Sequence, residues 1–373
     1  AAHAQNTGQR WARLRERGAL GVIAISNPKV MSLPWDRIKA NRLDEGFTMA
    51  DSALDERGGM RFSMYANPAR AEQFFAGSGH TMAEIVADAN ANRPLPRFVL
   101  PYRVRTRIRM TQRRVESPNV VGIIPGSDPG LRNESVVLSA HLDHLGVGAP
   151  IHGDSIYNGA MDNASGVASL IEIARSLHAG PPPRRSIVLL ALTGEEKGLL
   201  GSCGFAAHPP AAIGRMVANI NVDMFLPITP LRYVIAYGEK ESDLGDWFHA
   251  AADSAKLKVQ PDPEPLQNYF VRSDQYNFIL AGVPSIFVDF GPGPDPAIQK
   301  RFEQWRRDRY HAPSDDTNQP IDFAAADAFN RILLGFTREV ADRPERPRWK
   351  PDSFFRRFER DVNAPQSAVP ASH

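Results

Sequence analysis

Cysteine is scarce in this sequence, and long hydrophobic runs and an excess of one charge are absent. The single cysteine, Cys203, excludes a disulfide within the chain. No apolar run approaches the roughly 20 residues that a membrane-spanning helix needs. The 44 basic and 42 acidic residues are well mixed and give a net charge of +2, so charge indicates neither a nucleic-acid partner nor an anionic membrane surface. No internal repeat or low-complexity tract is present, and we expect a globular protein.

The composition changes along the chain, which is long enough for one large domain and a smaller unit. Residues 1–112 combine a helical pattern over 9–17 with the apolar segment ALGVIAIS and then lose periodicity, which predicts a small α/β module and a linker. Residues 113–342 form the expected large domain. Residues 343–373 are rich in proline and arginine, and we expect this tail to wrap loosely or to be disordered.

Strand-like and helix-like segments alternate within the large domain. The expected strands are VVGIIPG, SVVLSAH, SIVLLALT, MVANINVDMF, YVIAY and PSIFVDF. Helices are expected over 163–178, 242–255 and 323–340, with a short one after Gly198. The apolar stripe of the helix at 163–178 consists of Val167, Leu170, Ile171, Ala174 and Leu177. Continuous apolar strands flanked by helices predict an α/β fold whose sheet is buried on both faces.

Polar side chains stand where these strands end, and in such sheets functional groups lie just beyond the carboxyl ends of the strands. SVVLSAH ends in His141, Asp143 follows two residues later, and Asp162 immediately precedes the clearest helix. The other candidates are Glu195 and Glu196 after SIVLLALT, Asp223 after ANINV, and His311 in DRYHAPSDD. Each is a possible metal ligand or base.

Two imidazoles and three carboxylates suit a pair of zinc ions, because catalytic zinc takes nitrogen and oxygen ligands and keeps a position for water. Five protein ligands hold two ions only if one carboxylate bridges them. Asp162 is the best bridge, because small residues flank it and let backbone and metals approach closely. These are Gly159, Ala160, Ala164, Ser165 and Gly166. Glu195 and Glu196 are neighbours that point in different directions, so one is expected to bind metal and the other to act as general base.

Each candidate also has a simpler structural explanation. His141 could be a hydrogen-bonded strand end, Asp162 a helix cap, and Asp223 a turn residue. Glu195 and Glu196 could be exposed charge at the start of a helix, and His311 a loop histidine. Five such accidents at successive strand ends are less plausible than one site.

The remaining histidines lack this placement, and we expect them to be structural or surface residues. They include His144, His152, His178, His208 and His249. Cys203 has no partner in a local motif and is a poor candidate for a nucleophile.

Six segments in this order resemble the co-catalytic zinc aminopeptidases typified by the secreted bacterial leucyl aminopeptidases, relatives of glutamate carboxypeptidase II. They are SAHLDHLG, NGAMDNASG, LTGEEKGLLGS, NVDM, RSDQYNFILAGVPSIF and YHAPSDD, and the resemblance spans about residues 119–338. It implies a three-layer α/β/α zinc-exopeptidase fold with a mixed, mostly parallel twisted sheet.

The resemblance also implies a role for each candidate. His141 and Asp223 would hold one zinc ion, Glu196 and His311 the other, and Asp162 would bridge the two.

The remaining roles concern proton transfer and support. Glu195 would be the general base, and Tyr310 would polarise the scissile carbonyl unless it is only a packed core residue. Asp143 would accept a hydrogen bond from His141 and fix its tautomer. Ser273 and Asp274 would shape the substrate pocket.

The chain departs from this family pattern in two places. Its opening module resembles only the second half of a protease-associated domain, so we expect a processed or truncated form. Gln275 stands where the family commonly has histidine, a change expected to bear on specificity. The start AAHAQ resembles the remnant of a cleaved export signal. The expected location is therefore the bacterial periplasm or exterior, with the signal segment absent from this chain.

The predicted activity is removal of amino-terminal residues from peptides with a free amino terminus, by a water bridged between two zinc ions. Alternatives on the same scaffold are a glutaminyl cyclase, which uses one zinc, and a carboxypeptidase, which needs a cationic cluster. A receptor-like binding module with a decayed metal site is a further alternative. The intact set of candidate ligands argues against decay. Neither the oligomeric state nor the preferred side chain follows from the sequence.

Overall fold

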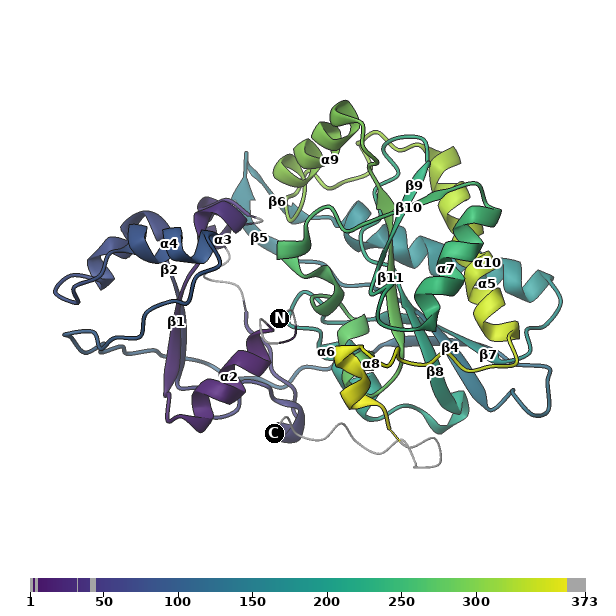
Figure 1. The fold of residues 1–373 in the computed structure, drawn as a ribbon, viewed down its shortest axis with the longest axis horizontal. Coiled ribbons are helices and arrows are strands. Elements are labelled where there is room, and N and C mark those ends of the chain that lie inside the picture. The colour runs from purple at the N-terminus through teal and green to yellow at the C-terminus, as the bar shows by residue number, and fades with distance from the viewer. Residues whose placement is uncertain (1–2, 4–5, 32, 41–44, 361–373) are drawn as a thin grey trace. The chain divides into compact units, whose positions relative to one another are not determined.

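The computed structural model describes residues 3, 6–31, 33–40 and 45–360 (Figure 1). Two compact units emerge from the contacts along the chain. Unit 1 comprises Ala1–Asn6, Leu43–Asp55 and Ser117–His373, and unit 2 comprises Thr7–Arg42 and Glu56–Glu116. The domain boundaries expected from the sequence stay predictions.

Unit 2 is built on a two-stranded parallel sheet. Strand β1 (Gly21–Ile25) pairs with β2 (Phe62–Ala66) in register along its whole length. The helices and turns of this unit are α2 (Thr7–Glu16), η1 (Pro28–Val30), α3 (Trp35–Ala40), η4 (Pro68–Phe74) and α4 (Met82–Asn90). The helix and strand expected near the start of the chain are confirmed by α2 and β1, which are separated by a left-handed turn at Gly18 (φ 83°).

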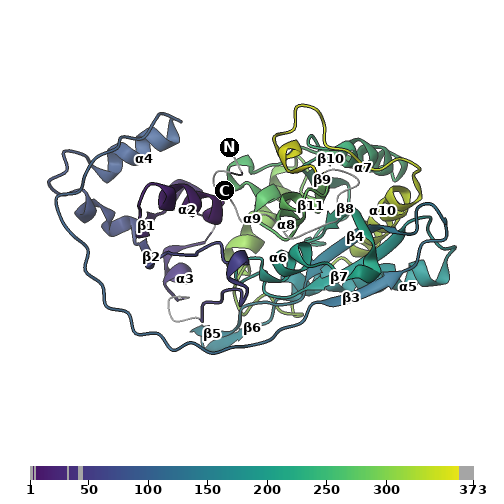
Figure 2. The same ribbon diagram turned by 90° about the horizontal axis from the view of Figure 1, so that it is seen from below.

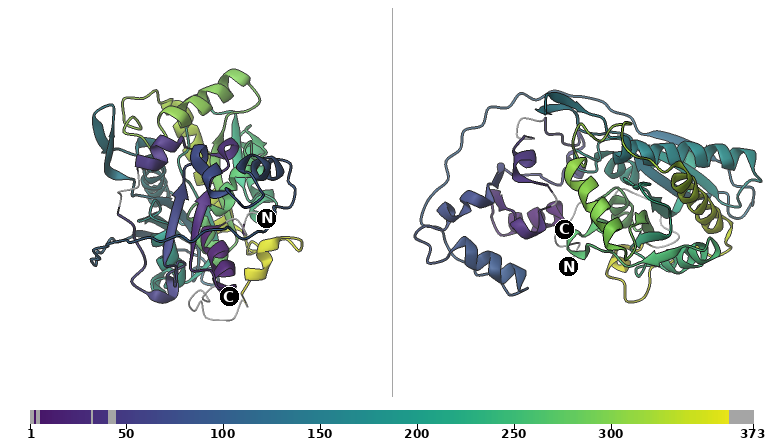
Figure 3. Two further views of the ribbon diagram at one scale, coloured as in Figure 1. Left: turned by 90° about the vertical axis from the view of Figure 1, so that its left-hand side faces the viewer. Right: turned by 90° about the horizontal axis from the view of Figure 1, so that it is seen from above.

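Unit 1 is organised by a seven-stranded sheet in the order β10-β9-β11-β8-β4-β7-β3, seen from further sides in Figure 2 and Figure 3. Its strands are β3 (Val120–Ile124), β4 (Glu134–His141), β7 (Ser186–Leu192), β8 (Arg215–Asn221), β9 (Tyr233–Tyr237), β10 (Lys258–Gln260) and β11 (Ser285–Gly291). The central pairs are parallel, while β3 on β7 and β9 on β11 are antiparallel. The predicted α/β fold with a mixed, mostly parallel sheet is confirmed.

Helices cover both faces of this sheet. One hydrophobic cluster includes side chains from α5 (Ser165–Ala179), α7 (Asp243–Ser254), α9 (Pro296–Asp308) and α10 (Phe323–Asp342). A second cluster, on the other face, includes side chains from α6 (Leu200–Ala207) and α8 (Gln275–Leu280). Outside the layers lie the hairpin β5 (Gly146–Ile151) and β6 (Asp154–Tyr157) and the turns η3 (Ser52–Leu54), η5 (Ala160–Ala164), η6 (Ala211–Ile213), η7 (Pro265–Gln267), η8 (Tyr269–Val271) and η9 (Phe354–Phe358). Within the described ranges, no helix combines the length and apolar character that crossing a membrane requires.

Strand β4 shows why the sheet needs two covered faces. Val136, Leu138 and Ala140 belong to the first cluster, and Val137 belongs to the second. Successive side chains of a strand point to opposite faces, so an uninterrupted apolar strand is stable only between two helical layers.

The buried stripe of α5 differs from the prediction. Leu170 and Leu177 are buried as expected, but Ile171 is 66% exposed, and Ile173 takes its place in the core. The helix begins at Ser165 rather than at 163, and its orientation on the sheet is set by packing of Gly166 close to Ala140. The apolar periodicity predicted the helix correctly, but it did not predict which side of the helix faces the sheet.

Within the tail expected over 343–373, residues 343–360 pack within unit 1 instead of wrapping loosely, and residues 361–373 lie outside the described residues. Trp349 and Phe355 are buried, and Trp349 forms an isolated bridge with Ser242. Arg346 donates to Oε1 of Glu134 at 2.8 Å. Buried aromatic side chains and ion pairs therefore order this Pro- and Arg-rich segment, although its sequence has little apolar periodicity.

Glu134 joins this segment to the edge of the core. It is buried, as is Arg185, whose Nε donates to Glu134 Oε2 at 2.7 Å. Although burial opposes the charge, Arg346 and Arg185 hold the pKa of Glu134 below its usual range. Removing this carboxylate would leave the Arg185 guanidinium buried without its charge partner, which is costly.

We predict that Glu134→Ala destabilises unit 1 by about 3–5 kcal/mol. Urea-induced unfolding, followed by tryptophan fluorescence, measures this loss. Asp327→Ala is the matched control, because Asp327 and its partner Arg331 are both exposed on α10, where ion pairs contribute little. Equal unfolding midpoints for the two variants would contradict the role of the buried cluster.

Candidate metal centre

The predicted ligands meet at the carboxyl ends of three neighbouring parallel strands. His141 is the last residue of β4 and pairs with Leu192, the last residue of β7. Asp223 lies two residues beyond the end of β8. Because these strands end at the same level, the residues that follow them share one edge of the sheet.

Asp162 and His311 come from the segments flanking this edge. Asp162 lies in η5 directly before α5, and His311 follows α9 with a left-handed φ of 53°. That conformation is uncommon outside glycine. It accompanies an imidazole whose Nε2 lies 3.2 Å from Asp162 Oδ2 and 3.2 Å from Glu196 Oε2.

The two oxygens of Asp162 face different groups. Oδ1 lies 3.2 Å from His141 Nε2, which is itself 3.1 Å from Asp223 Oδ1. Oδ2 faces His311, so one carboxylate is shared between two sets of donor atoms. The structure thus brings together all five residues predicted as metal ligands, in the arrangement that a bridging carboxylate requires.

The donor set fits zinc. Zinc bonds of 2.0 to 2.2 Å place tetrahedral ligands roughly 3.3 to 3.6 Å apart, close to the 3.1 and 3.2 Å separations of the His141, Asp162 and Asp223 donor atoms. The donors are imidazole nitrogens and carboxylate oxygens, and within the described residues this group is one of those whose atoms lie within 4.8 Å of one another. These residues would hold the ion directly, without rearrangement of the strands.

Charge at this edge favours cations. Although burial opposes it, Asp223 and Asp162 raise the pKa of His141 well above its usual range. Burial likewise opposes the shift at His311, yet Glu196 and Asp162 raise its pKa to about 10. The same contacts hold the pKa of Asp162 below its usual range against the effect of burial. Positive charge between the carboxylates is therefore strongly stabilised.

Glu195 differs from its neighbour Glu196. Burial raises the pKa of Glu195 well above its usual range, and the carboxylates of Asp223 and Glu196 add to this effect. Burial also raises the pKa of the Tyr310 phenol, so that side chain keeps its proton. The Tyr310 ring lies against the His311 ring, with centroids 4.0 Å apart. The Glu195 carboxyl, which has a raised pKa, and the Tyr310 phenol, which can donate a hydrogen bond, thus lie beside the candidate ligands.

The predicted hydrogen bond from His141 to the Asp143 carboxylate is not made. His141 Nδ1 donates instead to the backbone oxygen of Asp143 at 2.9 Å and lies 3.9 Å from Oδ1. The carboxylate accepts the backbone N–H groups of Glu195 at 3.0 Å and Glu196 at 3.3 Å, because the turn after β7 presents these donors to it. Asp143 therefore orients the two glutamates, while its carbonyl leaves His141 Nε2 free to bind metal.

Ser273 and Asp274, expected to shape the substrate pocket, are both buried. Ser273 Oγ donates to Asp223 Oδ2 at 2.6 Å and accepts from Asn221 at 3.1 Å. Gln275 also accepts from Asn221, at 2.9 Å. Burial raises the pKa of Asp274 to about 7. The hydrogen bonds to β8 draw the Ser-Asp-Gln segment inward, where it supports Asp223.

Two residues that support Asp162 were not singled out from the sequence. Asp315 accepts the backbone N–H groups of Met161 and Asp162, each at 3.0 Å. Asn163 donates to Val222 O at 3.0 Å and accepts from Met224 N at 3.1 Å. For Asp315, the first acidic residue of the SDD segment after His311 was the available signal, but its partner Asp162 lies 153 residues away in the chain.

His144 was expected to be a structural or surface residue, and it lies at the centre instead. Its Nδ1 is 2.9 Å from Glu196 Oε1 and 4.0 Å from Asp162 Oδ2. His152, His178, His208 and His249 are exposed, in agreement with the prediction. The signal for His144 was its position three residues after His141 at the same strand end.

Gly159 makes this approach of His144 possible. A Cβ at Gly159 would lie 2.6 Å from the His144 ring and 2.4 Å from the backbone oxygen of Asp162, and its φ is 68°. Any other residue would be strained in this conformation. Of the small residues around Asp162, Gly159 is thus one that leaves no room for a side chain.

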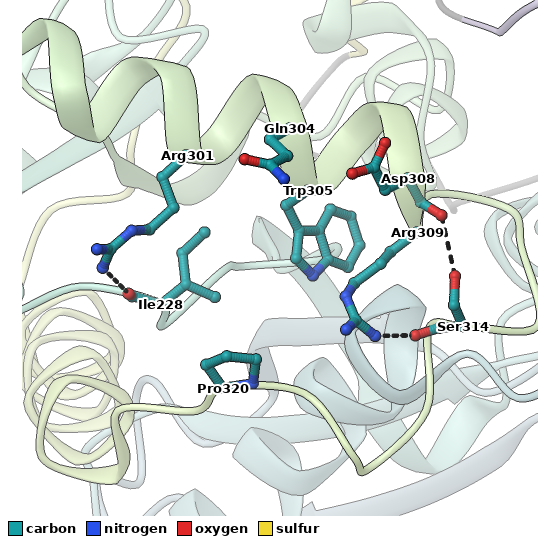
Figure 4. A pocket seen from close by; sticks show the side chains of 8 residues that line it. All are labelled: Ile228, Arg301, Gln304, Trp305, Asp308, Arg309, Ser314 and Pro320. Atoms are coloured by element: carbon teal, nitrogen blue, oxygen red, sulfur yellow. Dashed lines mark hydrogen bonds between the residues drawn. The ribbon is translucent and has the colours of Figure 1, made fainter.

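A separate hollow of about 510 Å³ lies beside α9 (Figure 4). It is lined by Ile228, Arg301, Gln304, Trp305, Asp308, Arg309, Ser314 and Pro320. Its guanidinium groups are engaged, since Arg301 donates to Ile228 O at 3.2 Å and Arg309 donates to Ser314 O. No predicted ligand or base lines it, so the hollow is distinct from the metal centre.

An α/β sheet whose strand ends present imidazoles and carboxylates around a buried point defines a metal-dependent hydrolase. The chain belongs to peptidase family M28, whose model matches residues 119–337. Family membership confirms the prediction of a hydrolase of the metallopeptidase class.

Individual relatives match smaller parts. A probable leucine aminopeptidase of Arthroderma otae is 28% identical over 61% of this chain and 58% of its own. A vacuolar membrane protease of Tuber melanosporum is 31% identical over 28% of this chain and 10% of its own. Among solved structures, the aminopeptidase from Aneurinibacillus sp. strain AM-1 has a TM-score of 0.50 and 18% identity, covering 94% of this chain and 70% of that one. The chain thus spans less than two thirds of these curated relatives.

The prediction of a periplasmic or secreted bacterial protein is wrong. The curated relatives named above are fungal, and a second vacuolar membrane protease, from Candida dubliniensis, is 34% identical over 25% of this chain and 9% of its own. The prediction depended on a few opening residues and on one branch of the resemblance.

We predict that Asp315→Ala weakens zinc binding about 10- to 100-fold, the usual effect of removing a group that orients a ligand. Competition with a chelator of known affinity measures the loss. The control is Asp316→Ala, because Asp316 is the next residue and bonds locally to Asn318 N at 2.8 Å. Unchanged zinc affinity in Asp315→Ala would show that Asp162 does not need this support.

Proposed function

We propose that this chain is a zinc-dependent aminopeptidase with two ions per chain. His141 and Asp223 would hold one ion, Glu196 and His311 the other, and Asp162 would bridge them. The observation that carries the proposal is the division of the Asp162 oxygens between His141 at 3.2 Å and His311 at 3.2 Å. When bound, such a pair of ions activates water and polarises a carbonyl.

Glu195 is the proposed general base. Its raised pKa gives the carboxylate affinity for a proton, which it would take from the attacking water and later return to the leaving amine. Asp143 supports this role, because it accepts the N–H of Glu195 and fixes the turn that carries the side chain. The protonated phenol of Tyr310 would donate a hydrogen bond to the carbonyl oxygen as negative charge develops there.

Carboxylates at the site would also recognise the substrate's free amine. Asp223 and Glu195 concentrate negative charge beside the reacting position, and an ammonium group is the complementary ligand. Acetylation removes that charge, so blocked peptides would lose this contact. The Arthroderma relative, described as a probable leucine aminopeptidase, supports a preference for hydrophobic first residues.

We also propose that unit 2 is a partial protease-associated module. The helix α2 followed by the strand β1 agrees with the order of elements expected for the second half of such a domain.

We predict that Glu195→Gln lowers kcat about 10²- to 10⁴-fold, while zinc per chain stays unchanged. The amide keeps the shape of the side chain but cannot accept the proton. Zinc analysis and steady-state kinetics on a leucyl peptide measure the two quantities. Glu172→Gln serves as a control, because Glu172 is a partly exposed residue of α5 that pairs with Arg175. Retained activity in Glu195→Gln would refute its role as base.

We further predict that an unblocked leucyl peptide is cleaved much faster than its N-acetyl form. Product analysis by mass spectrometry distinguishes loss of the first residue from internal or carboxyl-terminal cleavage. A chelator should abolish turnover, and added zinc should restore it. Equal rates on the two peptides would contradict amine recognition, and release of carboxyl-terminal residues would replace the aminopeptidase assignment.

A further inference from the structure

His144 is the buried polar side chain that the proposed mechanism does not use. Its side chain is 7% exposed, and neither ring nitrogen has a hydrogen-bond partner among the described residues. Buried ring nitrogens are ordinarily bonded. The polar contact that accompanies its burial is the approach of Nδ1 to within 2.9 Å of Glu196 Oε1.

The neighbouring atom of Glu196 has the same deficiency. Glu196 Oε1 is buried without a hydrogen-bond partner, although His144 Nδ1 lies only 2.9 Å away. The two groups lie at ion-pair distance, yet neither atom has its hydrogen-bonding capacity satisfied. Two unsatisfied donor atoms side by side, both facing Asp162, are the arrangement expected of two ligands that share a cation.

We propose that His144 is an additional ligand, through Nδ1, of the ion held by Glu196 and His311. This inference rests on the proposed function and extends its ligand set. His144, Asp162 and Glu196 offer donor atoms that all lie within 4.8 Å of one another, and the His311 ring lies 5.7 Å from the His144 ring at a steep angle of 75°. Four protein donors then surround one ion.

The loop that carries His144 is built for this contact. Gly159 leaves the space that the imidazole occupies, since its Cβ would lie 2.6 Å from the ring. The backbone of Asp162 is fixed by Asp315, so the shared oxygen faces His144 from a rigid support. A surface histidine would need neither feature.

A fourth protein ligand makes the two ions unequal. Zinc with four protein ligands is typical of closed sites, whereas zinc with three keeps an open position. The His141, Asp162 and Asp223 group provides three. The ion at His144 would therefore be the tighter one, and the group of His141, Asp162 and Asp223 would leave its ion a position for water.

Zinc binding in the full-length chain tests this proposal. X-ray absorption on the unmodified protein, loaded with zinc and freed of loose ions, should require three imidazoles per ion pair, from His141, His144 and His311, where the ligand set without His144 provides two. His144→Ala should weaken binding of one ion by more than about 100-fold, beyond the loss typical of a group that only orients a ligand. Chelator competition measures that affinity, and His249→Ala, which changes an exposed histidine of α7, should leave it unchanged.

The outcomes separate the two proposals. Two ions with two imidazoles, or unchanged affinity in a folded His144→Ala variant, would overturn the role of His144 and leave the proposed function standing. Fewer than two ions in the unmodified chain would overturn the two-ion centre and this inference together. His144→Asn provides a second, more conservative variant if the alanine variant does not fold, and the absorption measurement needs no variant.

Discussion

Several carboxylates lie close together in the buried centre of this structure, and their mutual repulsion is the constraint on which the rest of the site depends. Carboxylate oxygens of Asp162, Glu196 and Asp223 lie 3.1 to 3.2 Å from imidazole nitrogens of His141 and His311. Removing such carboxylates from water is costly unless positive charge accompanies them. The rise in the pKa of both histidines shows how strongly the site attracts that charge. The cluster of carboxylates therefore favours binding of a cation.

Holding these groups together requires side chains that form hydrogen bonds with the backbone around them. Asn163 bonds to Val222 and Met224, tying the start of α5 to the end of β8. Asp143 and Asp315 use their carboxylates to bind backbone N–H groups around the ligands. Each fixes a turn at a strand end, so the positions of the ligands follow from the register of the sheet and not from flexible loops.

The sequence indicated that the five candidate ligands lie together, because parallel strands place their ends together whatever their separation in the chain. It failed where position depends on distant partners. The role of Asp315 requires knowing that it meets a segment 153 residues away, and the burial of Ser273 depends on a bond to Asp223. Helix α9 was not predicted, because its buried face consists of only Phe302 and Trp305 among charged residues. Apolar periodicity carries no signal for such contacts.

The position of His144 depends both on a strand end and on a contact with a residue distant in the sequence. His144 lies three residues beyond His141, the last residue of β4, and Gly159 (φ 68°) leaves the space that its ring occupies. A glycine that leaves space for a histidine ring is a stronger sign of function than either residue alone, because a surface histidine needs no such space. The ligand pattern of a metal centre is thus better read from strand ends together with the glycines that face them.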